Sequence, residues 1–112
     1  MTPDLQAQAE RTFLAWGEGS EIALLRNHES GGVTTLTRFF RGARGHYHIH
    51  PGGEELFVIS GRLRVGSVEL SAGDYLFTPP GAGHDVFAHE DCLLLLVLPS
   101  MPDYSVSSPE GA

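Results

Sequence analysis

The chain has 112 residues, of which 41% are hydrophobic and 19% are charged, a composition typical of one soluble globular domain. Its formal charge of −7 argues against nucleic acid as a partner and against binding anionic membranes through charge. The single cysteine, Cys92, cannot form an internal disulfide, and residues 1–10 lack the basic-then-apolar order of a signal peptide. Because no apolar run approaches the ~20 residues of a membrane span, we expect a cytoplasmic protein without membrane contact.

The first predicted element is a short amphipathic helix over residues 4–16. Its apolar positions at helical spacing are Leu5, Ala9, Phe13 and Trp16. Such a stripe normally faces a core, so we expect this helix to dock on the main domain. Residues 1–19 are therefore predicted to form an N-terminal helix and linker.

After Gly17, short segments rich in β-branched and aromatic residues alternate with Gly and Pro clusters. The predicted strands are Glu21–Asn27, Val33–Phe40, Gly45–His50, Glu55–Ile59, Arg62–Val65, Asp74–Phe77, Asp85–Ala88 and Cys92–Leu98. Closely and regularly spaced strands of this length predict an all-β sandwich or barrel. We expect this barrel to cover residues 20–98 and the Pro- and Ser-rich residues 99–112 to form a flexible tail.

Residues 46–54, HYHIHPGGE, place histidines at every second position. Side chains alternate along a strand, so His46, His48 and His50 are predicted to share a face. On a solvent face they would be ordinary polar residues. On an interior face, buried imidazoles must bind a metal or form hydrogen bonds, and alternation alone does not decide between the two.

The spacing around these histidines extends over two longer motifs. The first reads G-x5-H-x-H-x3-E-x6-G from Gly42 to Gly61, and the second reads G-x5-P-x-G-x2-H from Gly73 to His84. Together they closely resemble the two signature motifs of the cupin superfamily, except that Ala88 replaces the final Asn of the second motif. The resemblance implies a double-stranded β-helix, or jelly-roll barrel, of the RmlC-like type.

The resemblance also implies a metal site made by His48, His50, Glu54 and His84. Three imidazoles and one carboxylate suit one divalent transition metal per chain, such as Fe, Zn, Mn or Ni. Glu55 is the alternative to Glu54, since a bulge in the preceding turn would exchange their faces. His46 has no place in the motif, so a supporting or cavity-lining role is favoured over ligation.

Three further residues are candidates for the cavity wall beside His46, namely Arg38, Phe40 and Tyr75. Arg38 would bind an acidic substrate if it faced inward, although exposure is the usual state of arginine. Phe40 and Tyr75 would contribute apolar surface, or simply pack between the sheets. No residue stands out as catalytic.

Within the superfamily, the sequence is similar to the ChrR-like cupins. The shared stretches are LTR at 36–38, HIHPGGEELFVISG at 48–61 and AGDYLFTPPGAGH at 72–84. That group includes the metal-binding domain of certain zinc-dependent anti-sigma factors and some dioxygenases that act on small aromatic ketones. Residues 1–16 are too few for a separate sigma-binding helical domain, so an anti-sigma role is not expected.

Three classes of function remain open. A metal-dependent enzyme of the non-haem oxygenase type is favoured, ahead of a non-catalytic metal or small-molecule sensor and of a sugar or small-acid isomerase. An isomerase needs a general base, and only His46, Tyr47 or Tyr75 is available. Because jelly-roll edges need cover, we also expect a homodimer.

Overall fold

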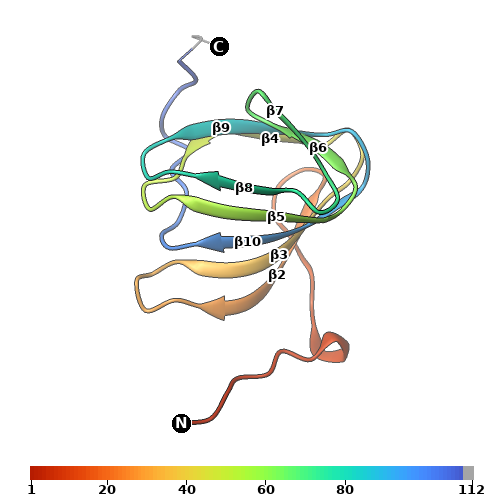
Figure 1. The fold of residues 1–112 in the computed structure, drawn as a ribbon, viewed down its shortest axis with the longest axis vertical. Coiled ribbons are helices and arrows are strands. Elements are labelled where there is room, and N and C mark those ends of the chain that lie inside the picture. Colours follow the sequence, from red (N-terminus) through yellow and green to blue (C-terminus); the bar gives the residue numbers. More distant parts are fainter. Residues whose placement is uncertain (110–112) are drawn as a thin grey trace.

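The computed structural model describes residues 1–109, and most of these lie in two antiparallel β-sheets (Figure 1). The strands are β1 (Leu14–Ala15), β2 (Ser20–Asn27), β3 (Val33–Phe39), β4 (Arg44–Ile49), β5 (Glu54–Ser60), β6 (Arg62–Val65), β7 (Val68–Ser71), β8 (Tyr75–Thr78), β9 (Gly83–Ala88) and β10 (Cys92–Leu98). One sheet has the order β1-β2-β3-β10-β5-β8, and the other has the order β4-β9-β6-β7. The predicted jelly-roll barrel is thereby confirmed.

The packed core lies between the two sheets at the end formed by β5, β10, β6 and β9. Leu63 and Val58 are fully buried there, and Leu94 and Ala88 pack in the same cluster. Alternation along β5 and β9 places every second residue inside, as in a sheet with one solvated face. Cys92 is buried in this cluster, and burial raises the pKa of its thiol, so it packs as a small apolar side chain.

The N-terminal segment does not form the predicted helix over residues 4–16. Its only helical residues are a 3-10 turn, η1 (Gln8–Glu10), while β1 pairs with β2 at the edge of the larger sheet. The apolar residues of the predicted helix do not pack together on the barrel. Leu5 is exposed, and Phe13 lies under the guanidinium of Arg38. A helix of this length is marginal in water without such packing.

Among residues 1–109, the structure contains no helix with the length and apolar character needed to cross a bilayer. Of the predicted flexible tail, residues 110–112 lie outside the described residues, and residues 99–109 bear directly on the site. Asp103 forms an isolated antiparallel bridge with Ile49 at the end of β4. The division of the chain at residues 20 and 98 stays a prediction.

Candidate metal site

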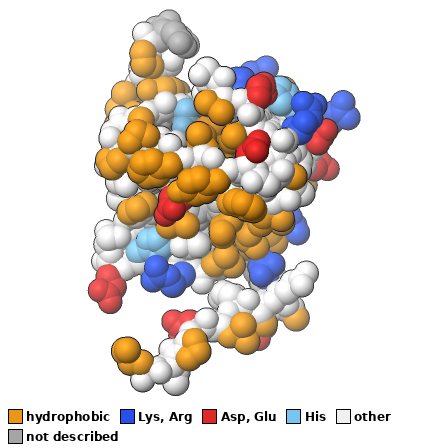
Figure 2. All heavy atoms as spheres, viewed as in Figure 1, with side chains coloured by type: hydrophobic (Ala, Val, Ile, Leu, Met, Phe, Trp, Pro, Cys, Tyr) orange, Lys and Arg blue, Asp and Glu red, His pale blue; other side chains and the backbone are white. Residues whose placement is uncertain are grey.

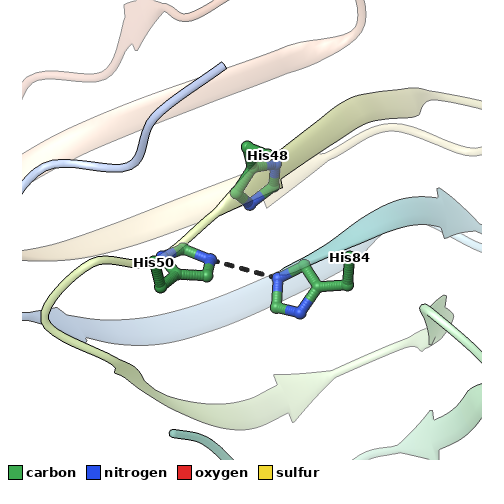
Figure 3. Close-up of side chains that lie close together, drawn as sticks. All are labelled: His48, His50 and His84. Atoms are coloured by element: carbon green, nitrogen blue, oxygen red, sulfur yellow. Dashed lines mark hydrogen bonds between the residues drawn. The ribbon is translucent and has the colours of Figure 1, made fainter. Parts of the chain in front are cut away.

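Three histidines meet inside the barrel, on the smaller sheet. His48 on β4 pairs in register with His84 on β9, and His50 follows directly after the end of β4. All three are buried, with ring centroids 4.7 to 4.9 Å apart (Figure 3). The ligand atoms of the three lie within 4.8 Å of one another, so the cluster could hold a metal ion.

Hydrogen bonds at the far side of two rings orient their Nε2 atoms toward the cluster centre. His48 Nδ1 donates to the carbonyl oxygen of His46 at 2.7 Å, which leaves the lone pair on Nε2. The hydroxyl of Thr78 lies 3.5 Å from Nδ1 of His84, and Nε2 of His84 lies 3.1 Å from Nε2 of His50. Outer partners of this kind fix the tautomer and the ring orientation of metal-binding histidines.

Glu54 reaches the same point from the larger sheet. The turn before it requires Gly53, which has φ 81° and whose Cβ would lie 2.9 Å from the carbonyl oxygen of Thr78. Oε1 of Glu54 lies 3.5 Å from Nε2 of His50 and 3.4 Å from Nε2 of His84. Glu55, the alternative considered from sequence, points outward and accepts a hydrogen bond from Tyr75.

Burial keeps the three histidines uncharged around neutral pH and makes the Glu54 carboxyl harder to ionise. Desolvation is the main cause that lowers the pKa of His50 to about 3, and the neighbouring His48 and His84 lower it further. Desolvation is also the main cause that lowers the pKa of His84 to about 4, and His48 is the second cause. Desolvation lowers the pKa of His48 as well and raises the pKa of Glu54 to about 7. The contacts of Glu54 with the histidines are therefore not ion pairs at neutral pH.

The donor set fits a divalent transition metal. Neutral imidazoles are the form that binds metal, and here none must first lose a proton. Oε1 of Glu54 and Nδ1 of His50 are buried without a hydrogen-bond partner. A buried carboxylate oxygen left unpaired is costly, and a cation placed between it and the imidazoles would remove that cost.

The cluster opens onto a cavity of about 1110 Å³ between the sheets. Its wall is mostly apolar, with Leu24, Leu56, Val86, Leu94, Leu96 and Leu98 among the lining residues. Thr35 and Thr37 on β3 add buried hydroxyls to this wall, and these two hydroxyls lie 3.0 Å apart. A volume of this size fits a small organic molecule with room for water.

The other predicted cavity residues divide into two groups. Phe40 and His46 line the cavity, but His46 is exposed and is not one of the three clustered histidines, and the pairing of β4 with β9 shifts register between Gly45 and His48. The other two lie elsewhere. Arg38 is exposed on the outer face of β3 beside Glu21, and Tyr75 is exposed on β8, so neither lines the cavity.

Three cavity residues had no signal in the sequence. In the sequence, Thr35 and Thr37 look like ordinary strand residues. Nothing in the sequence of β3 tells whether a threonine hydroxyl faces a cavity or packs against other side chains. Tyr104 lies in the segment predicted to be flexible, yet it lines the cavity next to His48. Contacts between residues so far apart in the chain depend on the fold.

Residues 2–102 match the family described as the ChrR cupin-like domain. Among curated proteins, DNA damage-repair/toleration protein DRT102 of Arabidopsis thaliana is 39% identical over 65 residues, which are 53% of this chain. The chain spans 21% of the length of that relative.

Solved structures with the same barrel include an acetylacetone dioxygenase from Acinetobacter johnsonii. It is 18% identical with a TM-score of 0.84, over 100% of this chain and 82% of that chain. A chain in the structure of Rhodobacter sphaeroides SigE in complex with the anti-sigma ChrR is 22% identical to this protein, with a TM-score of 0.72. The match covers 82% of this chain and 50% of that chain. At these identities the likeness shows the fold. Since the family match covers most of the chain, the protein belongs to the ChrR cupin-like family.

Proposed function

We propose that the protein is a metal-dependent enzyme of the non-haem oxygenase type that acts on a small, mostly apolar molecule held in the barrel. The observation that carries the proposal is the direct opening of the histidine cluster onto a large apolar cavity. His48, His50, His84 and Glu54 would hold one divalent metal, such as Fe, Zn, Mn or Ni. When bound, the metal supplies Lewis-acid chemistry, and iron also supplies redox chemistry with dioxygen.

The chain's own residues would bind and orient the substrate. The apolar wall excludes water and holds the apolar body of the ligand, and the two arginines among the lining residues, Arg41 and Arg44, are exposed. The hydroxyls of Thr35 and Thr37 offer a polar anchor on the larger sheet, across the cavity from the histidines. An uncharged ligand with oxygen atoms at both ends fits this arrangement better than a strongly charged one.

The first test combines elemental analysis with oxygen uptake. Protein purified without an affinity tag is expected to carry about one metal per chain, and the iron-loaded form is expected to consume dioxygen with acetylacetone or a related small ketone. Acetylacetone is the first choice because a structure with the same barrel is named for its oxidation. Stoichiometric metal without dioxygen uptake across a panel of small ketones would contradict the oxygenase assignment.

The threonine anchor gives a second prediction. Thr35→Val keeps the shape of the side chain and removes one hydroxyl, so the KM for a ligand anchored there should rise about 5- to 10-fold, the worth of one hydrogen bond. Metal content should not change, because Thr35 lies on β3, away from the cluster. An unchanged KM in both Thr35→Val and Thr37→Val would show that the ligand does not use this wall.

A non-catalytic metal sensor is the second candidate, favoured by the likeness to ChrR, which is solved in complex with SigE. A sensor would hold its metal with all coordination positions filled, whereas an enzyme keeps one open. X-ray absorption of the loaded protein, with and without added azide, separates the two. Azide enters the coordination shell only where a position is open.

We also propose a homodimer formed through the outer face of the larger sheet. Phe57, Ile59, Tyr75 and Phe77 are each more than 40% exposed, and Phe57 pairs in register with both Tyr75 and Leu95. Figure 2 shows hydrophobic side chains across the middle of this face, over β8, β5 and β10. Contiguous apolar surface of this kind marks an association site, and β8 is also an unpaired sheet edge.

Sedimentation velocity tests the dimer. Phe77→Glu is expected to shift a dimeric wild-type protein to monomer, because it places a charge within the buried patch. Val68→Glu is the matched control, since Val68 is 42% exposed on the smaller sheet. A monomeric wild-type protein at micromolar concentration would contradict the proposal.

A further inference from the structure

The segment after β10 runs beside the candidate metal site. We call residues 99–105 the C-terminal strap. In Figure 1 this blue segment leaves β10 and rises along the side of the barrel toward the sheet that holds β4 and β9. Asp103 and Ile49 exchange two backbone hydrogen bonds of 2.9 Å each, and Met101, Pro102 and Tyr104 line the cavity. The strap therefore extends the smaller sheet at the residue between His48 and His50.

The barrel is shaped to seat the strap. A Cβ at Gly32 would overlap the backbone of Pro99, and a Cβ at Gly52 would lie 2.6 Å from Oγ of Ser100. Oγ of Ser30 also donates to the carbonyl oxygen of Pro99 at 2.5 Å. Two glycines from separate turns thus leave room for the same crossing segment, which sets its path across the barrel.

A tight turn in the strap fixes Tyr104. Ser105 donates from its backbone nitrogen and its hydroxyl to Oδ1 of Asp103, at 2.8 and 2.6 Å, and these bonds lower the pKa of Asp103. Asp103 is also paired with Ile49. Because Asp103 and Ser105 are both held, the backbone of Tyr104 between them has little freedom. The Tyr104 ring lies 4.8 Å from the His48 ring, with an angle of 40° between the planes.

Tyr104 covers a face of His48 that the rest of the cluster leaves open. The His50 and His84 rings approach His48 nearly at right angles, at 85° and 86°. The backbone of His46 holds Nδ1 of the same imidazole. Tyr104 itself is 49% exposed, so it stands between this ligand and the solvent at the mouth of the cavity.

We infer that Tyr104 is a positioning residue, which holds the His48 ring in its ligating orientation and shields it from water, so that the strap sets how fast the metal leaves. The inference rests on the proposed metal site. The aromatic ring of Tyr104 makes the contact with His48, and no hydrogen bond of the Tyr104 hydroxyl is needed. Partners outside the ligand set typically change metal affinity about 10- to 100-fold when removed, and we expect the lower end for a half-exposed ring.

The test is the rate of metal release from cobalt-loaded protein into excess EDTA, followed by the visible absorption of Co(II). Tyr104→Ala is expected to release metal about 10-fold faster and to alter the Co(II) spectrum, while Tyr104→Phe behaves like wild type. Tyr75→Ala is the matched control, because Tyr75 is an exposed tyrosine on the outer face of β8. Thermal unfolding of the metal-free variants checks that each is folded.

Two results would overturn the inference. One is a release rate and spectrum of Tyr104→Ala equal to those of wild type, and the other is a Tyr104→Phe variant that loses metal as fast as Tyr104→Ala. Either result leaves the proposed function standing, because the wild-type protein still binds Co(II). A wild-type protein that binds no Co(II) would instead overturn the metal site itself.

Discussion

Replacing His50 with alanine is expected to leave the protein without stoichiometric metal. His50 is 1% exposed, and its Nε2 lies within 3.5 Å of both His84 and Glu54, at the centre of the donor set. Loss of an outer partner alone costs about 10- to 100-fold in metal affinity, so the loss of one imidazole ligand should exceed about 100-fold. Inductively coupled plasma mass spectrometry of untagged protein measures the metal-to-chain ratio directly.

His46→Ala is the matched control for this experiment. It removes an exposed histidine from β4, the strand that leads into His50, and it keeps the backbone carbonyl of His46 that accepts the hydrogen bond from His48 Nδ1. His50→Gln preserves most of the side-chain volume without an imidazole and guards against a collapse of the site. Wild-type stoichiometry in both His50 variants would exclude His50 as a ligand.

Replacing Glu54 with glutamine is expected to stabilise the metal-free protein at alkaline pH and to destabilise the metal-loaded protein relative to wild type. Burial raises the pKa of Glu54 from 4.5 to about 7, so the folded state holds this proton more tightly than the unfolded chain. The favourable contribution is complete below pH 4.5 and is lost as pH rises through 7. A shift of this size corresponds to about 3 kcal/mol, which Glu54→Gln should recover at pH 8 and not at pH 5.

Urea unfolding followed by circular dichroism, in EDTA at pH 5 to 8, measures this difference. The lowered pKa values of the histidines act in the opposite direction, with stability lost as pH falls below 6.5, but they contribute equally to both proteins. Glu55→Gln is the control, because Glu55 faces solvent one residue further along β5. A gap that does not change with pH would mean that the Glu54 carboxyl titrates normally.

With metal bound, the order of stability should reverse. The carboxylate of Glu54 then has a cation beside it, whereas an amide is a weaker ligand. Saturating metal stabilises a folded protein in proportion to its affinity, so wild type should gain more than Glu54→Gln. A variant that is more stable than wild type both with and without metal would remove Glu54 from the ligand set.

Most strands could be predicted from sequence because segments rich in β-branched and aromatic residues were bounded by Gly and Pro turn clusters. The bounds of β6 and β10 match the predicted segments, and the others differ by one or two residues. Two strands gave no usable signal. In β7 only Leu70 is buried, and both residues of β1 are exposed, so neither shows the alternation of a half-buried strand.

Some residues of the candidate site could likewise be predicted from local sequence patterns, and others could not. Motif spacing located His48, His50, Glu54 and His84, because turn lengths and strand alternation are local properties of the chain. The sides on which Arg38 and Tyr75 lie could not be predicted, since the face of a strand depends on which sheet covers it. Tyr104 and the threonine pair depend on contacts between distant segments, which no local pattern encodes.

The packed core and the cavity share part of one wall, because Leu56, Val86 and Leu94 belong to both. Leu63, Val65 and Leu70 lie in the core and not in the cavity wall, whereas Leu24, Thr35 and Met101 line the cavity and take no part in the core. Substitutions at Leu24, Thr35 or Met101 would therefore reshape the cavity without changing the core cluster, whereas substitutions in the shared wall would change both. A barrel organised in this way can acquire new ligands through evolution while keeping one scaffold and one metal site.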